Sequence, residues 1–167
     1  MEYLDQLDEL LSTEHRLMTI ESYDQERVED LFSELSRHNN KAYYLARPGQ
    51  GMFRIGAEHI EIPRTLTPQE ILKHIQNTRH YGIYILCDFQ DNLESEHVVM
   101  QLKQIATADA AKLIIFLSDF IDIPEALKPY TVRSKHQMRH NTIWYQQLNA
   151  AHFFFKQQAS QRGIVLQ

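Results

Sequence analysis

The stretch Tyr81-Gly82-Ile83-Tyr84-Ile85-Leu86-Cys87-Asp88 decides the fold. Its apolar residues follow one another without alternation, so a strand built from it would be apolar on both faces. Such a strand is typical of the centre of a parallel sheet, where helices cover both sides. A second stretch, Lys112-Leu113-Ile114-Ile115-Phe116-Leu117-Ser118-Asp119, has the same character. The two stretches predict two buried strands of one parallel sheet.

Three shorter segments complete the predicted sheet. They are apolar or aromatic and are bounded by polar or turn-forming residues: 16–21, 42–46 and 130–133. Residues 47–51 contain proline and two glycines and predict a turn. From Met52 to Pro63, the pairs Phe53/Ile55 and Ile60/Ile62 alternate. This alternation indicates a hairpin or an excursion along the sheet edge.

Helices are predicted between these strands. Apolar residues recur at helical spacing in residues 4–11, 28–35, 71–75 and 98–105. Ser22 or Asp24 is expected to cap the second helix, and Asp91 is a candidate cap farther along. Thr67, with Pro68 next and Glu70 three residues on, predicts a capping box.

The alternation of strands and helices predicts the fold class. We expect a three-layer α/β domain with a mainly parallel five-stranded sheet of P-loop-like (Rossmann-like) topology. Residues 1–134 would form this domain. Residues 135–167 would form a C-terminal helical tail, with its helix from about Asn141 to Ser160.

Composition narrows the function classes. The single cysteine, Cys87, excludes an intramolecular disulfide and a multi-cysteine zinc site, and a buried structural thiol is its expected role. A net charge of −5 argues against a general nucleic-acid binder. No apolar run approaches the roughly 20 residues of a membrane helix. The residues after Met1 lack the features of a signal peptide, so a cytoplasmic location is expected.

The ends of the predicted strands carry the residues to inspect, because ligands of doubly wound sheets bind there. Asp88 after an apolar strand resembles the Walker B aspartate that holds Mg²⁺ through water. Phe89 follows it, where a hydrolytic AAA ATPase has a water-polarising glutamate. Residues 21–27 replace the glycine-rich phosphate loop with Glu-Ser-Tyr-Asp-Gln-Glu-Arg, whose carboxylates would repel a triphosphate.

Two interpretations of these acidic residues stay open. They could converge on one edge and bind Mg²⁺ through oxygen ligands, as in metal-dependent phosphoester hydrolases. Alternatively, they are helix caps and solvated loop residues. The candidate acidic cluster consists of Glu21, Asp24, Asp88, Asp91 and Asp119, with Asp122 nearby. We expect no resident cofactor or metal, with Mg²⁺ as the alternative. His136 and His140 share helical spacing but lack the further ligands of a zinc site.

Three segments carry a family resemblance: Leu17–Val28 (LMTIESYDQERV), Ile83–Leu93 (IYILCDFQDNL) and Leu113–Leu127 (LIIFLSDFIDIPEAL). In this order and spacing they resemble the N-terminal domain of a family of two-domain AAA ATPases. That family is known as a hypothetical chloroplast reading frame product. Its P-loop-like N-terminal domain lacks a Walker A motif and precedes an active AAA domain. The resemblance implies a degenerate P-loop-like domain, either free-standing or a fragment of a longer protein.

The tail is the candidate interface. Large apolar residues, among them Trp144, Leu148, Phe154 and Phe155, would lie along one side of its helix. They would pack onto the domain itself, or dock a protein partner or a second copy of the chain.

The resemblance and the missing phosphate loop together predict a non-catalytic protein-interaction or regulatory domain without ATP hydrolysis. The alternatives are a Mg²⁺-dependent phosphoester hydrolase, and a sensor that binds nucleotide without hydrolysing it.

Overall fold

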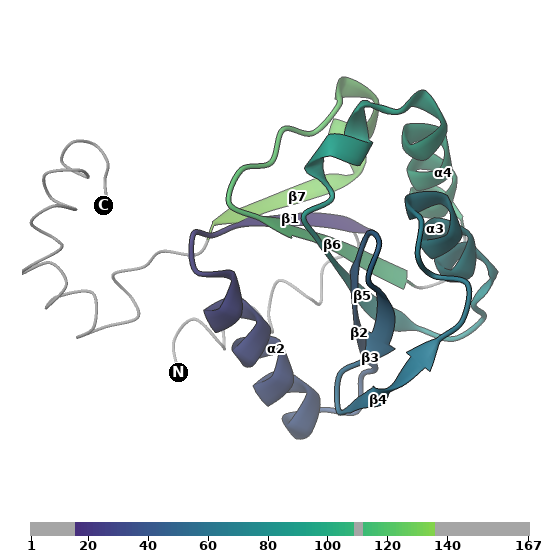
Figure 1. Cartoon of the computed structure of the whole chain (residues 1–167). Helices are drawn as coiled ribbons and strands as arrows, with labels where there is room; N and C mark the ends of the chain where they lie inside the picture. Colours follow the sequence, from purple (N-terminus) through teal and green to yellow (C-terminus); the bar gives the residue numbers. More distant parts are fainter. Residues whose placement is uncertain (1–15, 109–111, 136–167) are drawn as a thin grey trace, which may run out of the picture.

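The computed structural model describes residues 16–108 and 112–135. The predicted helix at 4–11 lies outside these residues, and so does the predicted tail at 135–167 except for Lys135, which ends β7. The described part forms a seven-stranded sheet with the order β4-β3-β2-β5-β6-β1-β7 (Figure 1). The strands are β1 (Leu17–Glu21), β2 (Tyr43–Arg47), β3 (Gly51–Arg54), β4 (Ala57–Ile62), β5 (Gly82–Cys87), β6 (Lys112–Ser118) and β7 (Thr131–Lys135).

Five of the strands are parallel and match the five that the sequence predicts. In their neighbour order, β2, β5, β6, β1 and β7 pair in parallel throughout. Every residue of β5 and of β6 is buried, as expected of central strands. The chain therefore has the predicted α/β architecture of Rossmann-like type.

The sheet is wider than the predicted five strands. Strands β3 and β4 form an antiparallel hairpin that pairs with β2 at the sheet edge. Gly56 in its turn has φ 102°, a left-handed conformation that glycine adopts at little cost. The alternating apolar pattern of residues 53–62 thus produces a hairpin, one of the two options that the sequence indicated, with β4 as the edge strand.

Helices cover both faces of the sheet and complete three layers. Figure 1 shows α2 (Gln25–His38) on one side, with α3 (Pro68–Asn77) and α4 (Glu96–Ala106) on the other. Strand β5 contributes side chains to the apolar cores on both faces of the sheet, because successive residues point to opposite faces. Ile83, Ile85 and Cys87 pack with α2, while Tyr84 and Leu86 pack with α3 and α4.

The helix starts follow local capping chemistry. Asp24 caps α2, and Thr67 and Glu70 form the predicted capping box of α3. The expectation for Asp91 is wrong, because Asp91 lies within the short 3-10 helix η1 (Gln90–Glu94). Ser95, directly after η1, accepts from the Val98 N–H and caps α4. A second 3-10 helix, η2 (Glu125–Tyr130), leads into β7. Within residues 16–108 and 112–135, no helix is long and apolar enough to cross a membrane.

Candidate functional site

The carboxyl edge of the parallel strands is the candidate functional site. The register pairs Glu21 of β1 with Ser118 of β6, and Cys87 of β5 with Leu117 of β6. The residues that follow these strands, Ser22, Asp88 and Asp119, therefore lie along one edge of the sheet. This edge is where open α/β sheets bind their ligands.

The N-terminus of α2 is occupied by its own chain. Only residues 22–24 separate β1 from α2. The Asp24 N–H donates to Ser22 Oγ (3.0 Å), and the Arg27 N–H donates to Asp24 Oδ1 (3.2 Å). The carboxylate of Asp24 thus takes a position that an anion would take at a free helix N-terminus.

An ion-pair cluster joins β2, α2 and the residue after β5. The guanidinium of Arg47 binds the carboxylate of Glu29, and its Nε lies 3.9 Å from Asp88 Oδ2. The Cys87 thiol lies 3.9 Å from Glu29 Oε2. Burial, with the nearby Glu29 and Asp88 carboxylates acting in the same direction, raises the pKa of Cys87 to about 12, although Arg47 opposes the shift. This thiol therefore stays protonated at neutral pH and is a poor nucleophile.

Asp88 itself adopts an unusual backbone conformation. Its φ is 55°, in the left-handed region that aspartate tolerates better than most residues. Its N–H still donates to the Leu117 carbonyl oxygen (3.1 Å), so the chain turns sharply while remaining attached to β6. The turn leaves the Asp88 side chain 59% exposed beside Arg47.

Glu21 holds the loop after β6 in place. Its Oε2 accepts from the Ile121 N–H (3.1 Å) and lies 3.9 Å from an Arg133 guanidinium nitrogen in β7. The same loop is held a second time by Gln90, whose side-chain amide exchanges two hydrogen bonds with the Asp122 backbone (2.8 and 3.2 Å). Glu21 thus has a structural role in addition to any functional one.

The structure places the candidate acidic residues along this edge, but with different partners. Glu21 bonds a backbone N–H, Asp24 caps α2, and Asp88 faces Arg47. The Ser118 hydroxyl lies 3.5 Å from Asp119 Oδ1, at the limit of a hydrogen bond. Among residues 16–108 and 112–135, no three His, Cys, Asp or Glu side chains are placed to hold a metal ion. The candidate interface residues of the tail, Trp144, Leu148, Phe154 and Phe155, lie outside the described residues.

Sequence reasoning missed two features of the edge. The first is the pair Glu29–Arg47, whose members are 18 positions apart and have no shared local pattern. The second is a pair of exposed aromatic side chains, Tyr23 (85% exposed) and Phe120 (62%), in the loops after β1 and β6. Their signal was available, since each is a large aromatic residue in a polar loop just beyond a strand.

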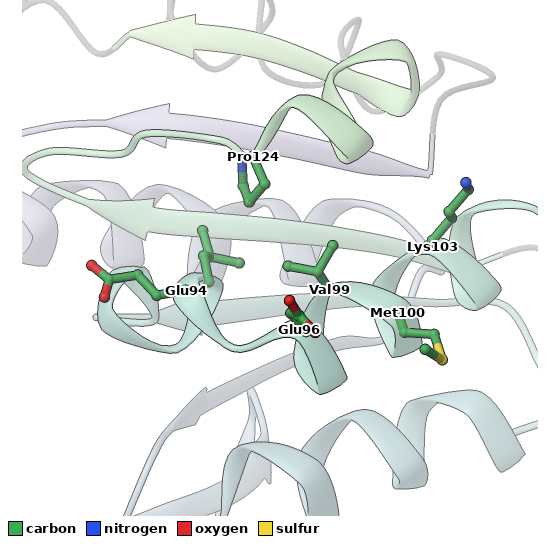
Figure 2. Close-up of a pocket in the computed structure, with 7 residues that line it drawn as sticks. Glu94, Glu96, Val99, Met100, Lys103 and Pro124 are labelled. Atoms are coloured by element: carbon green, nitrogen blue, oxygen red, sulfur yellow. The ribbon is translucent and has the colours of Figure 1, made fainter.

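A shallow hollow of about 480 Å³ lies beside α4 and reaches Pro124, in the loop that carries Phe120. Figure 2 shows Val99, Met100 and Lys103 of α4 with Glu94 of η1 and Pro124, the residue before η2. Its lining combines apolar side chains with Glu94, Glu96 and Lys103 and presents no nucleophile next to a base.

Comparison with known proteins agrees with this fold. Residues 3–136 match the model of a protein family described as SpoVK-like AAA ATPase, N-terminal domain. The comparison with curated proteins finds no match. The match covers most of the chain and agrees with the resemblance to AAA ATPase N-terminal domains predicted from the strand-end motifs. The chain therefore belongs to the SpoVK-like AAA ATPase N-terminal domain family.

Proposed function

We propose that this chain is a non-catalytic interaction or regulatory domain, related to AAA ATPases but without ATP hydrolysis of its own. The observation that carries the proposal is the N-terminus of α2, where the carboxylate of Asp24 accepts the Arg27 N–H. A phosphate bound there would have to displace this carboxylate and lie close to it.

The charges around α2 support the same conclusion. Glu26 lies in the first turn of the helix, and Asp88 follows the neighbouring strand β5. Like charges a few ångströms apart repel one another, most strongly where water is partly excluded. Arg47, a cation of this edge, is already paired with Glu29. Arg47 is therefore not available to neutralise the charge of a triphosphate at this edge.

The position after Asp88 supports the absence of hydrolysis. Phe89 is 1% exposed and packs against Phe116 with a ring-centroid distance of 5.9 Å. A residue that polarises water must face the solvent-filled site. Phe89 instead belongs to the core beneath α3 and α4.

The proposal also names the interacting segment, its partner and its location in the cell. In a degenerate P-loop-like domain of this kind, the tail would supply the interface through Trp144, Leu148, Phe154 and Phe155. Its partner would be another protein or a second copy of the chain, in the cytoplasm.

A nucleotide titration tests the catalytic part of the proposal. The chain is heated with ATP, ADP or GTP, with and without Mg²⁺, and phosphate release is measured in parallel. A ligand at 100 times its Kd adds about 2.7 kcal/mol, which raises the unfolding midpoint by about 5–10 °C. We expect neither a shift nor phosphate release. Phosphate release that Asp88→Asn abolishes would contradict the proposal.

Light scattering and affinity capture test the interaction part. The chain is compared with Trp144→Ala and Phe154→Ala, using the unfolding midpoint as the control for folding. We expect both substitutions to weaken self-association or the capture of a partner while the midpoint stays unchanged. Unchanged association and capture in folded variants would remove the tail from the interface.

A further inference from the structure

Two exposed aromatic rings mark an interaction surface at the carboxyl edge. We call Tyr23, Phe120 and the loops that carry them the aromatic edge. The two loops are tied together, because the Ser22 N–H donates to the Ser118 carbonyl oxygen (3.0 Å) and the Ile121 N–H to Glu21 Oε2 (3.1 Å). Single exposed apolar residues are common on protein surfaces. Two large aromatic residues on adjoining, hydrogen-bonded loops form a patch of the kind that binds a partner.

The charge around the aromatic edge is negative. Asp119 and Asp122 are exposed in the same loop as Phe120, and Asp24 follows Tyr23. Two of the nearby cations lie beside other carboxylates, since Arg47 pairs with Glu29 and Arg133 lies 3.9 Å from Glu21. A complementary occupant would combine aromatic side chains with positive charge.

The chain's own tail has this chemistry. Residues 136–167 contain Arg139, Lys156 and Arg162 and no Asp or Glu, whereas the whole chain has a net charge of −5. The same residues include Trp144 and the run Phe153-Phe154-Phe155. The tail therefore has a net charge of +3, whereas residues 1–135 have a net charge of −8.

The tail also starts at this surface. Strand β7 pairs with β1 so that Lys135, the last residue before the tail, stands opposite Glu21. Seven residues separate Lys135 from Ile143, where the apolar stripe begins. At no more than about 3.6 Å per residue, this spacer reaches up to about 25 Å. The stripe can therefore return to Tyr23, which follows β1, the neighbour of β7, and to Phe120, which follows β6 on the other side of β1.

We propose that residues 136–167 dock in cis on the aromatic edge, with their aromatic side chains against Tyr23 and Phe120 and their cations near the surrounding aspartates. The proposal deepens the proposed function, on which it rests for the tail as the interacting segment. A short tether gives the tail an effective concentration of about millimolar, so modest contacts suffice to keep it docked. An external partner of the tail would then compete with the domain's own surface.

Trp144 provides a direct test, because it is the only tryptophan of the chain. Its fluorescence emission and its quenching by acrylamide report the exposure of the tail in the full-length protein. We expect wild-type Trp144 to emit at shorter wavelength and to be quenched less than in the denatured chain. Tyr23→Ser and Phe120→Ser should each shift the emission to longer wavelength and increase quenching. Both side chains are exposed on the folded domain, so both variants should stay folded, and their unfolding midpoints should fall only by the small contribution of tail docking.

Met100→Ser is the matched control. Met100 is 58% exposed and lies on α4, which covers the face of the sheet opposite α2 (Figure 1). Met100→Ser should leave the emission and quenching of Trp144 unchanged. The double variant Asp119→Asn with Asp122→Asn should increase the quenching of Trp144. The proposal is overturned if wild-type Trp144 already emits as in the denatured chain, or if only Met100→Ser alters it.

Dilution separates docking in cis from exchange between copies. Emission from a tail docked in cis is independent of protein concentration, while a tail supplied by a second copy is released on dilution. Concentration-dependent emission would therefore overturn the proposal. The result is also independent of the proposed lack of catalysis, because phosphate release and Trp144 exposure are measured separately and either can fail alone.

Discussion

Replacement of Arg47 by methionine tests the ion-pair cluster at the carboxyl edge. The side chains of Arg47 and Glu29 are 28% and 24% exposed, so the pair is neither fully buried nor at the surface. Exposed pairs contribute about 0.2–1 kcal/mol, and breaking a buried pair costs about 3–5 kcal/mol. For Arg47→Met we therefore expect the free energy of unfolding to fall by about 2 kcal/mol. Most of this loss comes from the Glu29 carboxylate, which is left partly buried beside Cys87.

The double variant Arg47→Met with Glu29→Gln isolates that contribution. Glu29→Gln removes the charge that Arg47→Met leaves unpaired, so the combined loss should be smaller than the sum of the single losses. We expect a coupling energy of about 1–2 kcal/mol, within the range measured for contacting residues. Asp88 adds little to it, because its carboxylate is 3.9 Å from Arg47 Nε and is mostly exposed.

Urea unfolding of the four proteins measures the coupling. The denaturant slopes should agree, so that the midpoints report stability alone. Lys128→Met is the control, because Lys128 pairs with Glu125 at 2.6 Å on the surface. This substitution should lower the free energy of unfolding by less than about 1 kcal/mol. Single-variant losses that add to within about 0.5 kcal/mol would refute the assignment of this pair as a coupled contact.

Four further predictions concern individual residues. Thr67→Ala should lower the free energy of unfolding by about 1 kcal/mol, because the Glu70 N–H loses its acceptor in the capping box. An unchanged urea midpoint would contradict this prediction. Alkylation of Cys87 at pH 8 should require denaturation, and rapid labelling of the folded chain would show that the thiol is accessible. Between the ordinary pKa of 9.0 and about 12, only the unfolded chain loses the thiol proton, so stability should fall as pH rises. Relative to Cys87→Ala, the fall should approach about 1.4 kcal/mol per pH unit in urea titrations across this range. Gly51→Ala should lower the free energy of unfolding in urea by about 1–3 kcal/mol, because φ at Gly51 is 93°. Gln50→Ala, in the same turn, is the control and should change the free energy of unfolding by no more than about 0.5 kcal/mol. Equal effects of the two substitutions would exclude backbone strain as the cause.

Much of the fold was predictable because its signals are local. The uninterrupted apolar residues of β5 and β6 identify central strands without any knowledge of their neighbours. The capping box of α3 lies within four residues, so its chemistry is readable directly. The hairpin β3–β4 was predicted only as one of two options, because alternation on a partly exposed edge is a weaker signal than a fully buried strand.

The candidate site was less predictable, because its partners are distant in sequence. Asp91 is an acceptable helix cap by residue type, yet the chain inserts η1 before α4 and Ser95 takes that role. Several acidic residues can also be identified from their positions after strands. Which of them bonds a backbone N–H, as Glu21 does, depends on how neighbouring loops come together.

The sequence by itself determined the parallel strands, the class of the fold and the absence of a phosphate loop, because periodicity and capping act over a few residues. The tertiary structure decided that Glu29 meets Arg47 and that hydrogen bonds join the ends of β1 and β6 and the loops that follow them. Both arrangements follow from the strand order. It also decided that the basic tail begins opposite Glu21, through the register of β7 on β1. The hydrophobic pattern of each strand fixes which residues face the core, but the pairing of β7 with β1 also depends on the packing of the whole sheet.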